Sequence, residues 1–436
     1  MDELLIGISK ADITPPKPVP MAGYVARVGM SLGVHDPLWA RCFLFYQGRV
    51  KVALLVLEVL GIHEQWATKV RHQVAAAADM SPEEVVVACT HTHSGPAGLD
   101  IPPTSDPTQS ALAEFVLARA KQAAVQAVQT LAPARVGVVT APVTGIAGHR
   151  TRPQQPVDQT LWAMVIRDVR SRIRGILANF PCHSTVLGPD NRLLSGDLFG
   201  AAAAIAERRL GSDTIVALTV GAAGDISTRF FRQAQDFREV ERLGDFLATA
   251  LLRLSQTAAP VHADLAICWR RCWLPYKPVP TVNEVQHTLE KLQAELAVLA
   301  QQGTVSPCTL RIARTRVEGA ERLYAMVEAG ALTAGGVEAL LCGFRIGPGI
   351  LIGIPGEPFN SVGQAVRDRA APPFQVAVLG LANGYLGYFP DKDAVQEGWY
   401  EALISPFDHQ ATRVLTEAAT ALLADMMGEE ARERYT

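Results

Sequence analysis

Short apolar runs alternate with longer amphipathic segments along most of the chain. The runs have the length and the β-branched content of buried strands, and they cover residues 41–46, 52–57, 85–89, 135–139, 161–166, 175–179, 215–220, 350–353 and 375–379. Helical patterns lie between several of these runs, at residues 63–78, 110–131, 198–209, 236–257 and 411–427. This alternation predicts an α/β or mixed α+β fold, with a core of layered sheets and helices.

One segment departs from the alternation. Pro275, Pro278 and Pro280 precede two helical stretches, and the letters TAGG follow them. We interpret residues 275–335 as a helical insertion within one catalytic domain that spans residues 1–436.

The composition excludes several classes of protein. Of the 436 residues, 49% are apolar and 19% are charged, which is typical of a globular protein. The charges are spread along the chain and sum to −3, and no Lys/Arg cluster of the kind that binds nucleic acid is present. No apolar stretch is long enough for a transmembrane segment, and no signal peptide is visible at the N-terminus. Seven scattered cysteines fit a reducing compartment, so we expect a cytoplasmic protein.

Polar side chains follow several of the strand runs. His91 and His93 come just after the run at 85–89, within the letters THTHSGP. Residues two apart in a strand share a face, so we expect these two imidazoles to point the same way at the end of the strand. His183 and Glu357 each follow another run, and a sheet could bring them to the same rim as His91.

Two histidines and a glutamate form one of the common catalytic zinc sites. Zinc lowers the pKa of water and polarises a carbonyl group, and a nearby arginine or second histidine could stabilise an oxyanion. Each residue also has a structural alternative. A lone histidine is more often a hydrogen-bonded core residue, Glu357 could favour the start of a helix at Pro358, and Ser227 could cap a turn.

Taken together, these segments resemble the neutral/alkaline non-lysosomal ceramidase family, in the order in which the family has them. The motifs that carry the resemblance are GISKADITPPKPVPMAGY, GVHDPLWARCFLF, THTHSGPAG, HRTRP, NFPCHST, LLSGDLFG, GAAGDIST, IPGEPF and LANGYLGYFPDKDAVQEGWYE. They cover most of residues 5–405 apart from the helical insertion. We expect the chain to lack a counterpart of the family's C-terminal immunoglobulin-like domain.

The resemblance implies a single zinc ion and its ligands. The family's ligands fall on a set of four residues, His91, His183, Glu357 and Tyr388. Tyr388 is preferred over Tyr385 because the family's ligand tyrosine lies twelve residues before a second active-site tyrosine, which would be Tyr400.

The resemblance also implies four catalytic residues. His93 would transfer protons or support an oxyanion, Arg150 matches the family's active-site arginine, and Tyr400 would hydrogen-bond the substrate amide. Ser227 matches a serine that lines the family's active site. Whether Ser227 attacks the substrate or positions water stays open, since a covalent route needs an adjacent base, for which His93 is the evident candidate.

We therefore expect a zinc-dependent hydrolase of a linear N-acyl amide, acting on a small-molecule or lipid substrate. The alternatives are a metal-dependent esterase or other hydrolase of a small non-lipid substrate, and a binding module with a structural metal. The last is disfavoured because structural zinc sites are generally rich in cysteine. Arg229 departs from the family's pattern, and its guanidinium favours a smaller or anionic substrate.

Overall fold

An eight-stranded sheet forms the larger part of the core in the computed structural model, which describes residues 3–211, 213–261, 263–302 and 304–428. The strand order is β11-β9-β8-β6-β1-β3-β4-β5. The strands are β1 (Leu4–Asp12), β3 (Trp39–Gln47), β4 (Val50–Leu57), β5 (Val85–Cys89), β6 (Ala132–Pro142), β8 (Thr160–Asp168), β9 (Ile173–Phe180) and β11 (Ile215–Val220). β4 and β5 run parallel, as do β9 and β11, whereas the other neighbours are antiparallel.

A second sheet packs face to face against the first. Its strands, in spatial order, are β13 (Leu265–Pro275), β14 (Gly336–Ile346), β15 (Gly349–Gly353) and β17 (Gln375–Leu379). Phe43 and Phe45 of the large sheet share one buried core with Phe344 and Leu351 of the small sheet. Because alternate side chains of a strand point to opposite faces, each sheet has a second apolar face, which helices cover.

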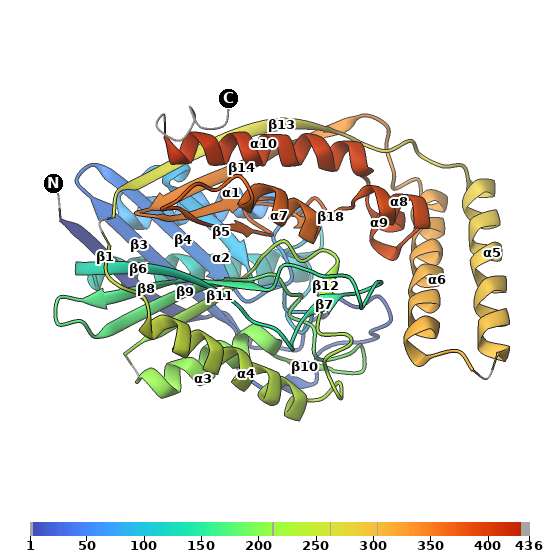
Figure 1. The fold of residues 1–436 in the computed structure, drawn as a ribbon, viewed down its shortest axis with the longest axis horizontal. Coiled ribbons are helices and arrows are strands. Elements are labelled where there is room, and N and C mark those ends of the chain that lie inside the picture. Colours follow the sequence, from blue (N-terminus) through green and yellow to red (C-terminus); the bar gives the residue numbers. More distant parts are fainter. Residues whose placement is uncertain (1–2, 212, 262, 303, 429–436) are drawn as a thin grey trace.

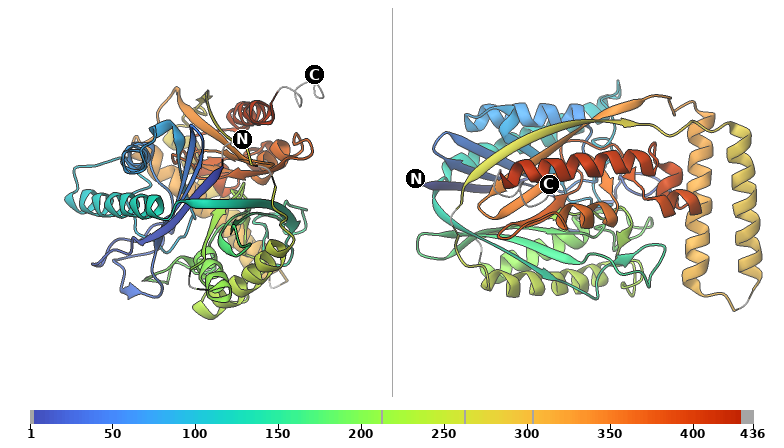
Figure 2. Two further views of the ribbon diagram at one scale, coloured as in Figure 1. Left: turned by 90° about the vertical axis from the view of Figure 1, so that its left-hand side faces the viewer. Right: turned by 45° about the horizontal axis from the view of Figure 1, so that its top comes forward.

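The helices complete four layers, in the order helix, sheet, sheet, helix (Figures 1 and 2). The outer face of the large sheet carries α1 (Glu64–Ala78), α2 (Pro107–Gln129), α3 (Asp197–Leu210) and α4 (Phe237–Gln256). The outer face of the small sheet carries α7 (Asn360–Arg367) and α10 (His409–Met427). The predicted layered α/β architecture is confirmed, and all nine strand runs and all five helical patterns are present. Among the described residues, no helix is both long enough and apolar enough to cross a membrane.

Two helices extend from the tip of a strand pair. β13 and β14 pair along their full length, from Leu265 with Ile346 to Pro275 with Gly336. Between them stand α5 (Val282–Gln301) and α6 (Pro307–Glu328), which project from the layered body in Figure 1. The expected helical insertion is therefore a helical hairpin at the end of a β-hairpin. The assignment of the whole chain to one domain stays a prediction.

The large sheet twists so far that its two edge strands, β5 and β11, come into contact. Neighbouring strands rotate by about 20–25° relative to one another, which accumulates to roughly 150° over seven steps. Gly175 of β9 shows how closely distant strands approach, because a Cβ atom at this position would lie 2.7 Å from Cδ1 of Ile8 on β1. As a result, segments that follow β5 and β9 meet, although the strand pairing alone makes these strands run in opposite directions.

Short elements line the place where these segments meet. They are the strands β2 (Gly33–Val34), β7 (Gly148–His149), β10 (Leu193–Leu194), β12 (Ile226–Ser227), β16 (Glu357–Pro358) and β18 (Tyr388–Phe389), and the helices α8 (Lys392–Glu397) and α9 (Tyr400–Ile404). The short helix η1 (Pro82–Glu84) instead precedes β5, at the opposite end of that strand. β16 pairs with β18 and so sets Glu357 beside Tyr388. The segment 381–401, whose glycines are typical of a loop, contains α8 and the start of α9.

Candidate metal centre

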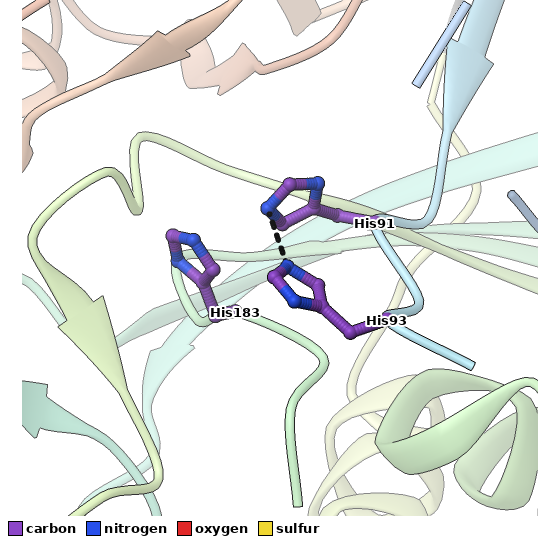
Figure 3. A group of neighbouring side chains, drawn as sticks. All are labelled: His91, His93 and His183. Carbon is purple, nitrogen blue, oxygen red and sulfur yellow. Dashed lines mark hydrogen bonds between the residues drawn. The ribbon is translucent and has the colours of Figure 1, made fainter. Parts of the chain in front are cut away.

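Three buried histidines converge at the ends of β5 and β9. His91 and His93 follow β5 and His183 follows β9, and Figure 3 shows the three imidazoles facing one another. Nε2 of His91 lies 3.2 Å from Nε2 of His93. One ring nitrogen from each of the three side chains lies within 4.8 Å of the others, so the group could hold a metal ion.

The two histidines of the THTH motif meet for a different reason from the one expected. β5 ends at Cys89, so His91 and His93 are not on a strand face, and that part of the interpretation is wrong. His91 instead has a left-handed backbone with φ of 63°, a conformation that non-glycine residues adopt rarely and often at functional sites. Its N–H donates to the carbonyl oxygen of Val59, which fixes the turn.

Backbone carbonyl groups fix the orientation of two imidazoles. Nδ1 of His91 lies 2.8 Å from the carbonyl oxygen of Leu60, and Nδ1 of His183 lies 2.7 Å from that of Ala223. A carbonyl oxygen can only accept a hydrogen bond, so Nδ1 carries the proton in both rings, and in the neutral form of each ring Nε2 carries a lone pair. Both lone pairs point into the centre, as in histidines that bind a metal through Nε2.

Glu357 brings a carboxylate to the same centre. Its Oε2 lies 3.1 Å from Nε2 of His91 and 3.0 Å from Nε2 of His183. The hydroxyl group of Tyr385 donates to the other oxygen, Oε1, over 2.8 Å. Glu357 follows β15 of the small sheet, whereas the histidines follow strands of the large sheet. The ligands therefore come from two sheets, and the expected rim of a single sheet is wrong.

The donor set fits a divalent cation. Oε2 of Glu357 has no hydrogen-bond donor, since the nearest nitrogens carry lone pairs. Burial lowers the pKa of His183 to about 4, with further lowering by Arg150 and His91. Burial opposes ionisation of Glu357, and positive charge next to the carboxylate would hold the pKa of this group well below its usual range. Where both imidazoles are neutral, a bound cation would supply that charge. Tetrahedral ligands about 2.1 Å from a zinc ion lie about 3.4 Å apart, close to the three distances observed here.

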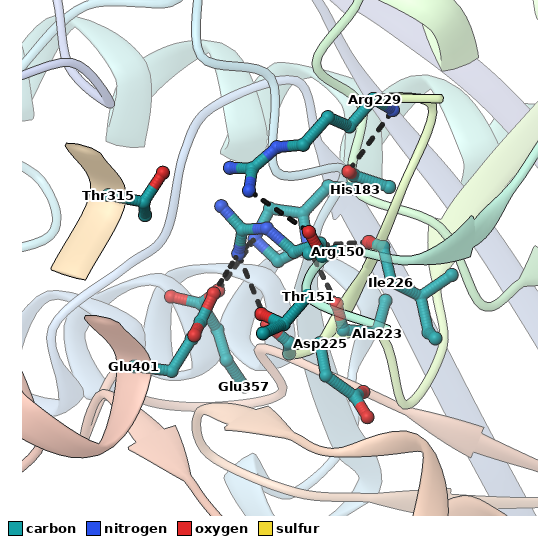
Figure 4. Close-up of polar contacts among 12 residues, drawn as sticks. Arg150, Thr151, His183, Ala223, Asp225, Ile226, Arg229, Thr315, Glu357 and Glu401 are labelled. Carbon is teal, nitrogen blue, oxygen red and sulfur yellow. Dashed lines mark hydrogen bonds and ion pairs between the residues drawn. The ribbon is translucent and has the colours of Figure 1, made fainter. Parts of the chain in front are cut away.

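A guanidinium group stands next to the metal centre (Figure 4). Nη1 of Arg150 lies 3.1 Å from Oε1 of Glu401 and 3.5 Å from Nε2 of His183. Nη1 also donates to the carbonyl oxygen of Gly224, whereas Nε is buried without a partner. Glu401 was missed by the sequence analysis, although it ends the quoted WYE segment. It raises the pKa of Arg150, against the effect of burial.

Tyr388 and Tyr400 line the side of the centre formed by the small sheet and α9. The rings of Tyr388 and His183 are nearly parallel, with 6.4 Å between their centroids. Tyr400 meets Tyr388 edge to face at 6.5 Å. Burial raises the pKa of both phenols, so each keeps its proton at neutral pH. Tyr385 rather than Tyr388 makes the direct hydrogen bond to Glu357, a role the sequence analysis did not assign.

Ser227 lies beside His183, and the backbones of these two residues form a parallel β-bridge. Its Oγ accepts a hydrogen bond from the N–H of Arg229 over 3.3 Å. Within the described part of the chain, the Ser227 hydroxyl makes no hydrogen bond to His93. The expected pairing of Ser227 with His93 is therefore absent from the described contacts, and the choice between the two roles of Ser227 stays a prediction.

Tyr24 and Arg27 cover His93, and both were missed as site residues. The rings of Tyr24 and His93 lie 5.0 Å apart, and Nη1 of Arg27 donates to the carbonyl oxygen of His93 over 2.7 Å. Tyr24 is the last residue of the quoted motif that ends in MAGY, so the family resemblance could have indicated it as a site residue. Burial and the neighbouring histidines lower the pKa of His93 well below its ordinary value, so this imidazole is neutral at pH 7.

The model of the family described as neutral/alkaline non-lysosomal ceramidase, N-terminal, matches residues 4–236, just over half of the chain. The chain belongs to this family. All three histidines, Tyr24, Arg150 and Ser227 lie within the matched part. Glu357, Tyr385, Tyr388 and Tyr400 lie beyond it.

Curated relatives are similar over part of their length. A neutral ceramidase of Pseudomonas aeruginosa is 24% identical over 222 residues, and neutral ceramidase 2 of Arabidopsis thaliana is 28% identical over 225 residues. These matches cover 45% and 47% of this chain and 32% and 30% of the relatives. The matched segment thus spans about a third of the relatives' length.

Solved structures extend the similarity of fold to nearly the whole chain. The crystal structure of the Pseudomonas aeruginosa neutral ceramidase superposes with a TM-score of 0.73 at 20% identity, covering 98% of this chain and 76% of that one. A ceramidase complexed with C2 gives a TM-score of 0.71 at 18% identity, covering 100% and 76%. The four-layer fold, including the part that carries Glu357, is therefore a ceramidase fold.

Proposed function

We propose that the protein is a zinc-dependent hydrolase of linear N-acyl amides, with one zinc ion held by His91, His183 and Glu357. The observation that supports this most strongly is the buried carboxylate oxygen of Glu357, which lies 3.1 Å and 3.0 Å from Nε2 of two imidazoles and has no hydrogen-bond partner among the described residues. A divalent cation would satisfy all three atoms at once. Tyr388 is the proposed fourth ligand, and His93 lies close enough to take that position instead.

A bound zinc ion supplies Lewis acidity toward a carbonyl oxygen and lowers the pKa of water. The residues around it would transfer protons and stabilise the charge that develops on the substrate. His93, a neutral imidazole whose Nε2 lies 3.2 Å from Nε2 of His91, would accept and return a proton. Arg150, which keeps its charge, would stabilise the oxyanion that develops on the amide carbonyl.

Tyr400 and Ser227 would position the substrate and water. The Tyr400 phenol keeps its proton and can donate a hydrogen bond to the amide. Among the described residues the Ser227 hydroxyl makes no hydrogen bond to a base, which favours a role in holding water over one as the nucleophile. A ceramidase cleaves an N-acylated lipid, and membership of that family supports an N-acyl amide, either a lipid or a smaller molecule, as the substrate.

Metal analysis combined with an amide screen tests this proposal. We expect about one equivalent of zinc per chain in the purified wild type, and release of fatty acid from N-acyl amines of graded chain length. His183→Ala should lose both the metal and the turnover, because it removes one of three proposed ligands. His72→Ala, which removes an exposed histidine of α1, is the matched control and should keep both. Fully metal-loaded wild type that cleaves no N-acyl amide would overturn the proposed activity.

A further inference from the structure

Arg229 places a second guanidinium group beside the candidate centre. The proposed amide hydrolysis assigns no role to this group. Its Nη1 donates to the carbonyl oxygen of Arg150 over 3.2 Å, and in Figure 4 its side chain lies next to that of Arg150. Arg150 in turn lies within 3.5 Å of a ring nitrogen of His183. A group bound by Arg229 would therefore lie a few bonds from the reacting amide.

Arg229 has no carboxylate of its own. Among the residues that the structure describes, Arg229 forms no ion pair, and the nearby Glu401 is paired with Arg150. Burial and the charge of Arg150 lower the pKa of Arg229, and Glu401 opposes this only in part. A guanidinium has five N–H donors, and a single bond to a carbonyl oxygen leaves most of them free to bind a ligand.

Other cations surround the same position. Arg232 donates to the carbonyl oxygens of Thr185 and Val186 and, within the described ranges, to no carboxylate. Arg311 of α6 is near enough for its charge to lower the pKa of both Arg229 and Arg232. Three further carboxyl groups lie near these arginines. Asp197 is buried, and burial raises its pKa to about 7, while Glu239 pairs with Arg242 and Glu318 pairs with Arg311.

The charge balance is therefore positive outside the metal ligands, and a divalent cation would make it more so. A neutral amide leaves this excess charge uncompensated at a half-buried position, where an ion pair is worth more than at the open surface. The planar fork of a guanidinium matches a carboxylate or phosphate, each of which can accept two parallel hydrogen bonds.

We propose that the substrate carries a carboxylate or phosphate group close to the scissile amide, and that Arg229 is the specificity-determining residue that binds it. This inference rests on the proposed amide hydrolysis and names the class of amide. Arg311 adds charge from the helical hairpin, so that the anion is enclosed between the end of β12 and α6.

Matched substrate pairs test the proposal on the metal-loaded protein. N-dodecanoylglycine and N-dodecanoylglycinamide differ only by a carboxylate on the amine side, and N-dodecylsuccinamic acid and N-dodecylsuccinamide differ only by one on the acyl side. We expect kcat/KM in at least one pair to favour the acid by about tenfold or more, because only the acid can form a partly desolvated ion pair with Arg229. The pair that shows the preference identifies the side that carries the anion.

Variants assign the preference to Arg229. The acid-to-neutral ratio should fall by about tenfold in Arg229→Gln and by less in Arg229→Lys, which keeps the charge without the fork. Arg170→Gln removes an exposed arginine in the turn between β8 and β9, at the opposite end of β9 from His183, and should keep the wild-type ratio. If Arg229→Gln does not fold, the half-exposed Arg311→Gln should still lower the ratio by about threefold. Equal rates within both pairs, or a preference that survives in Arg229→Gln, would overturn the proposal.

Binding of succinate separates this inference from the proposed activity. If the wild type cleaves no amide at all, the proposed function fails, and calorimetric titration with succinate then decides on the anion site. Binding that weakens by about tenfold in Arg229→Gln supports the site. Equal binding by both proteins, or none by the wild type, rejects it.

Discussion

At the scale of single residues, Tyr385 holds the carboxylate of Glu357 in place. Its hydroxyl donates to Oε1, which leaves Oε2 to face the two imidazoles. Hydrogen bonds to metal ligands of this kind fix the orientation of the ligand and commonly change metal affinity by about 10–100-fold.

Tyr385→Phe should therefore weaken zinc binding by about tenfold while the fold is kept, because the ring stays and only the hydroxyl is lost. Competition with a chromophoric chelator measures the affinity. Tyr324→Phe on α6, whose hydroxyl makes no hydrogen bond among the described residues, is the control. An unchanged affinity in Tyr385→Phe would show that this hydrogen bond has no part in metal binding.

Asp225 is a second residue at this scale, and its burial makes the stability of the protein depend on pH. Burial raises the pKa of its carboxyl group to about 7, although the N–H of Asn360 donates to Oδ1 and lowers it. His149 lies 3.6 Å away, and burial lowers the pKa of this imidazole to about 4. Both groups are therefore mostly neutral just below pH 7.

Because the pKa of Asp225 is higher in the folded than in the unfolded chain, its contribution to stability is fully present below about pH 4. It is lost as the pH rises to about 7, by roughly 3 kcal/mol between pH 5 and pH 8. Asp225→Asn keeps the acceptor for Asn360 and should lack this dependence. Urea unfolding at both pH values measures the difference between the two proteins, and parallel pH profiles would contradict the assignment.

The residues at this scale differ in how far sequence could predict them. His91, His183 and Glu357 stand out because polar groups that follow buried strands are costly without a partner, and the family resemblance named them. Tyr385 and Glu401 could not be assigned roles, because each acts through a neighbour that only the folded chain supplies. The left-handed backbone of His91 has no sequence signal, since it depends on the turn beside Val59.

At the scale of elements, α9 carries Tyr400 and is held from two sides. Nζ of Lys277 donates to the carbonyl oxygens of Ala402 and Leu403 near the end of the helix, and burial lowers the pKa of Lys277 to about 8. On the other side, Gly319 of α6 lies so close to α9 that a Cβ atom there would be 3.1 Å from Cα of Tyr400.

Gly319→Val should push α6 away from α9 and move Tyr400. We expect kcat/KM for amides to fall by about tenfold or more, since displacements near 1 Å at an active site are costly. Valine has a slightly better helix propensity than glycine, so a lower melting temperature would come from the clash and not from the helix itself. Ala325→Val, at an exposed position of the same helix, serves as the control. Wild-type kinetics in Gly319→Val would show that this contact does not position Tyr400.

The elements themselves were largely predictable from apolar periodicity, which identifies β5, β11 and β17 to the residue. The helical insertion was also predictable, from its prolines and its helical pattern. Its position at the tip of β13 and β14 was not, because these strands carry mixed polar residues and pair across about sixty residues of intervening chain. The short helix α9 lies in a glycine-rich segment that local signals indicate is a loop.

At the scale of the whole molecule, twist decides which strand ends meet. Strand pairing alone sends β5 and β9 in opposite directions, and only the accumulated rotation of the large sheet brings the residues that follow them together. No local sequence signal reports such an accumulated rotation. The expectation of a single-sheet rim failed for another reason, which is that Glu357 follows a strand of the small sheet, although the residues named for the rim do converge.

The helical hairpin stands outside the layered core, so its removal should leave the core intact. Replacing residues 281–331 by a short Gly-Ser linker should keep the far-UV spectrum of the sheets and the metal content, since β13 and β14 still pair. The amide kcat/KM should fall by about tenfold or more, because α9 loses its packing against α6. Loss of zinc from the shortened protein would show instead that the hairpin supports the metal centre itself.

The account depends most on a metal ion at the point where the two sheets meet. Anomalous scattering from crystals at the zinc absorption edge tests this directly. We predict a single peak about 2.0–2.2 Å from Nε2 of His91, Nε2 of His183 and the carboxylate of Glu357. A peak elsewhere in the molecule, or no peak in crystals of protein that still cleaves amides, would contradict it.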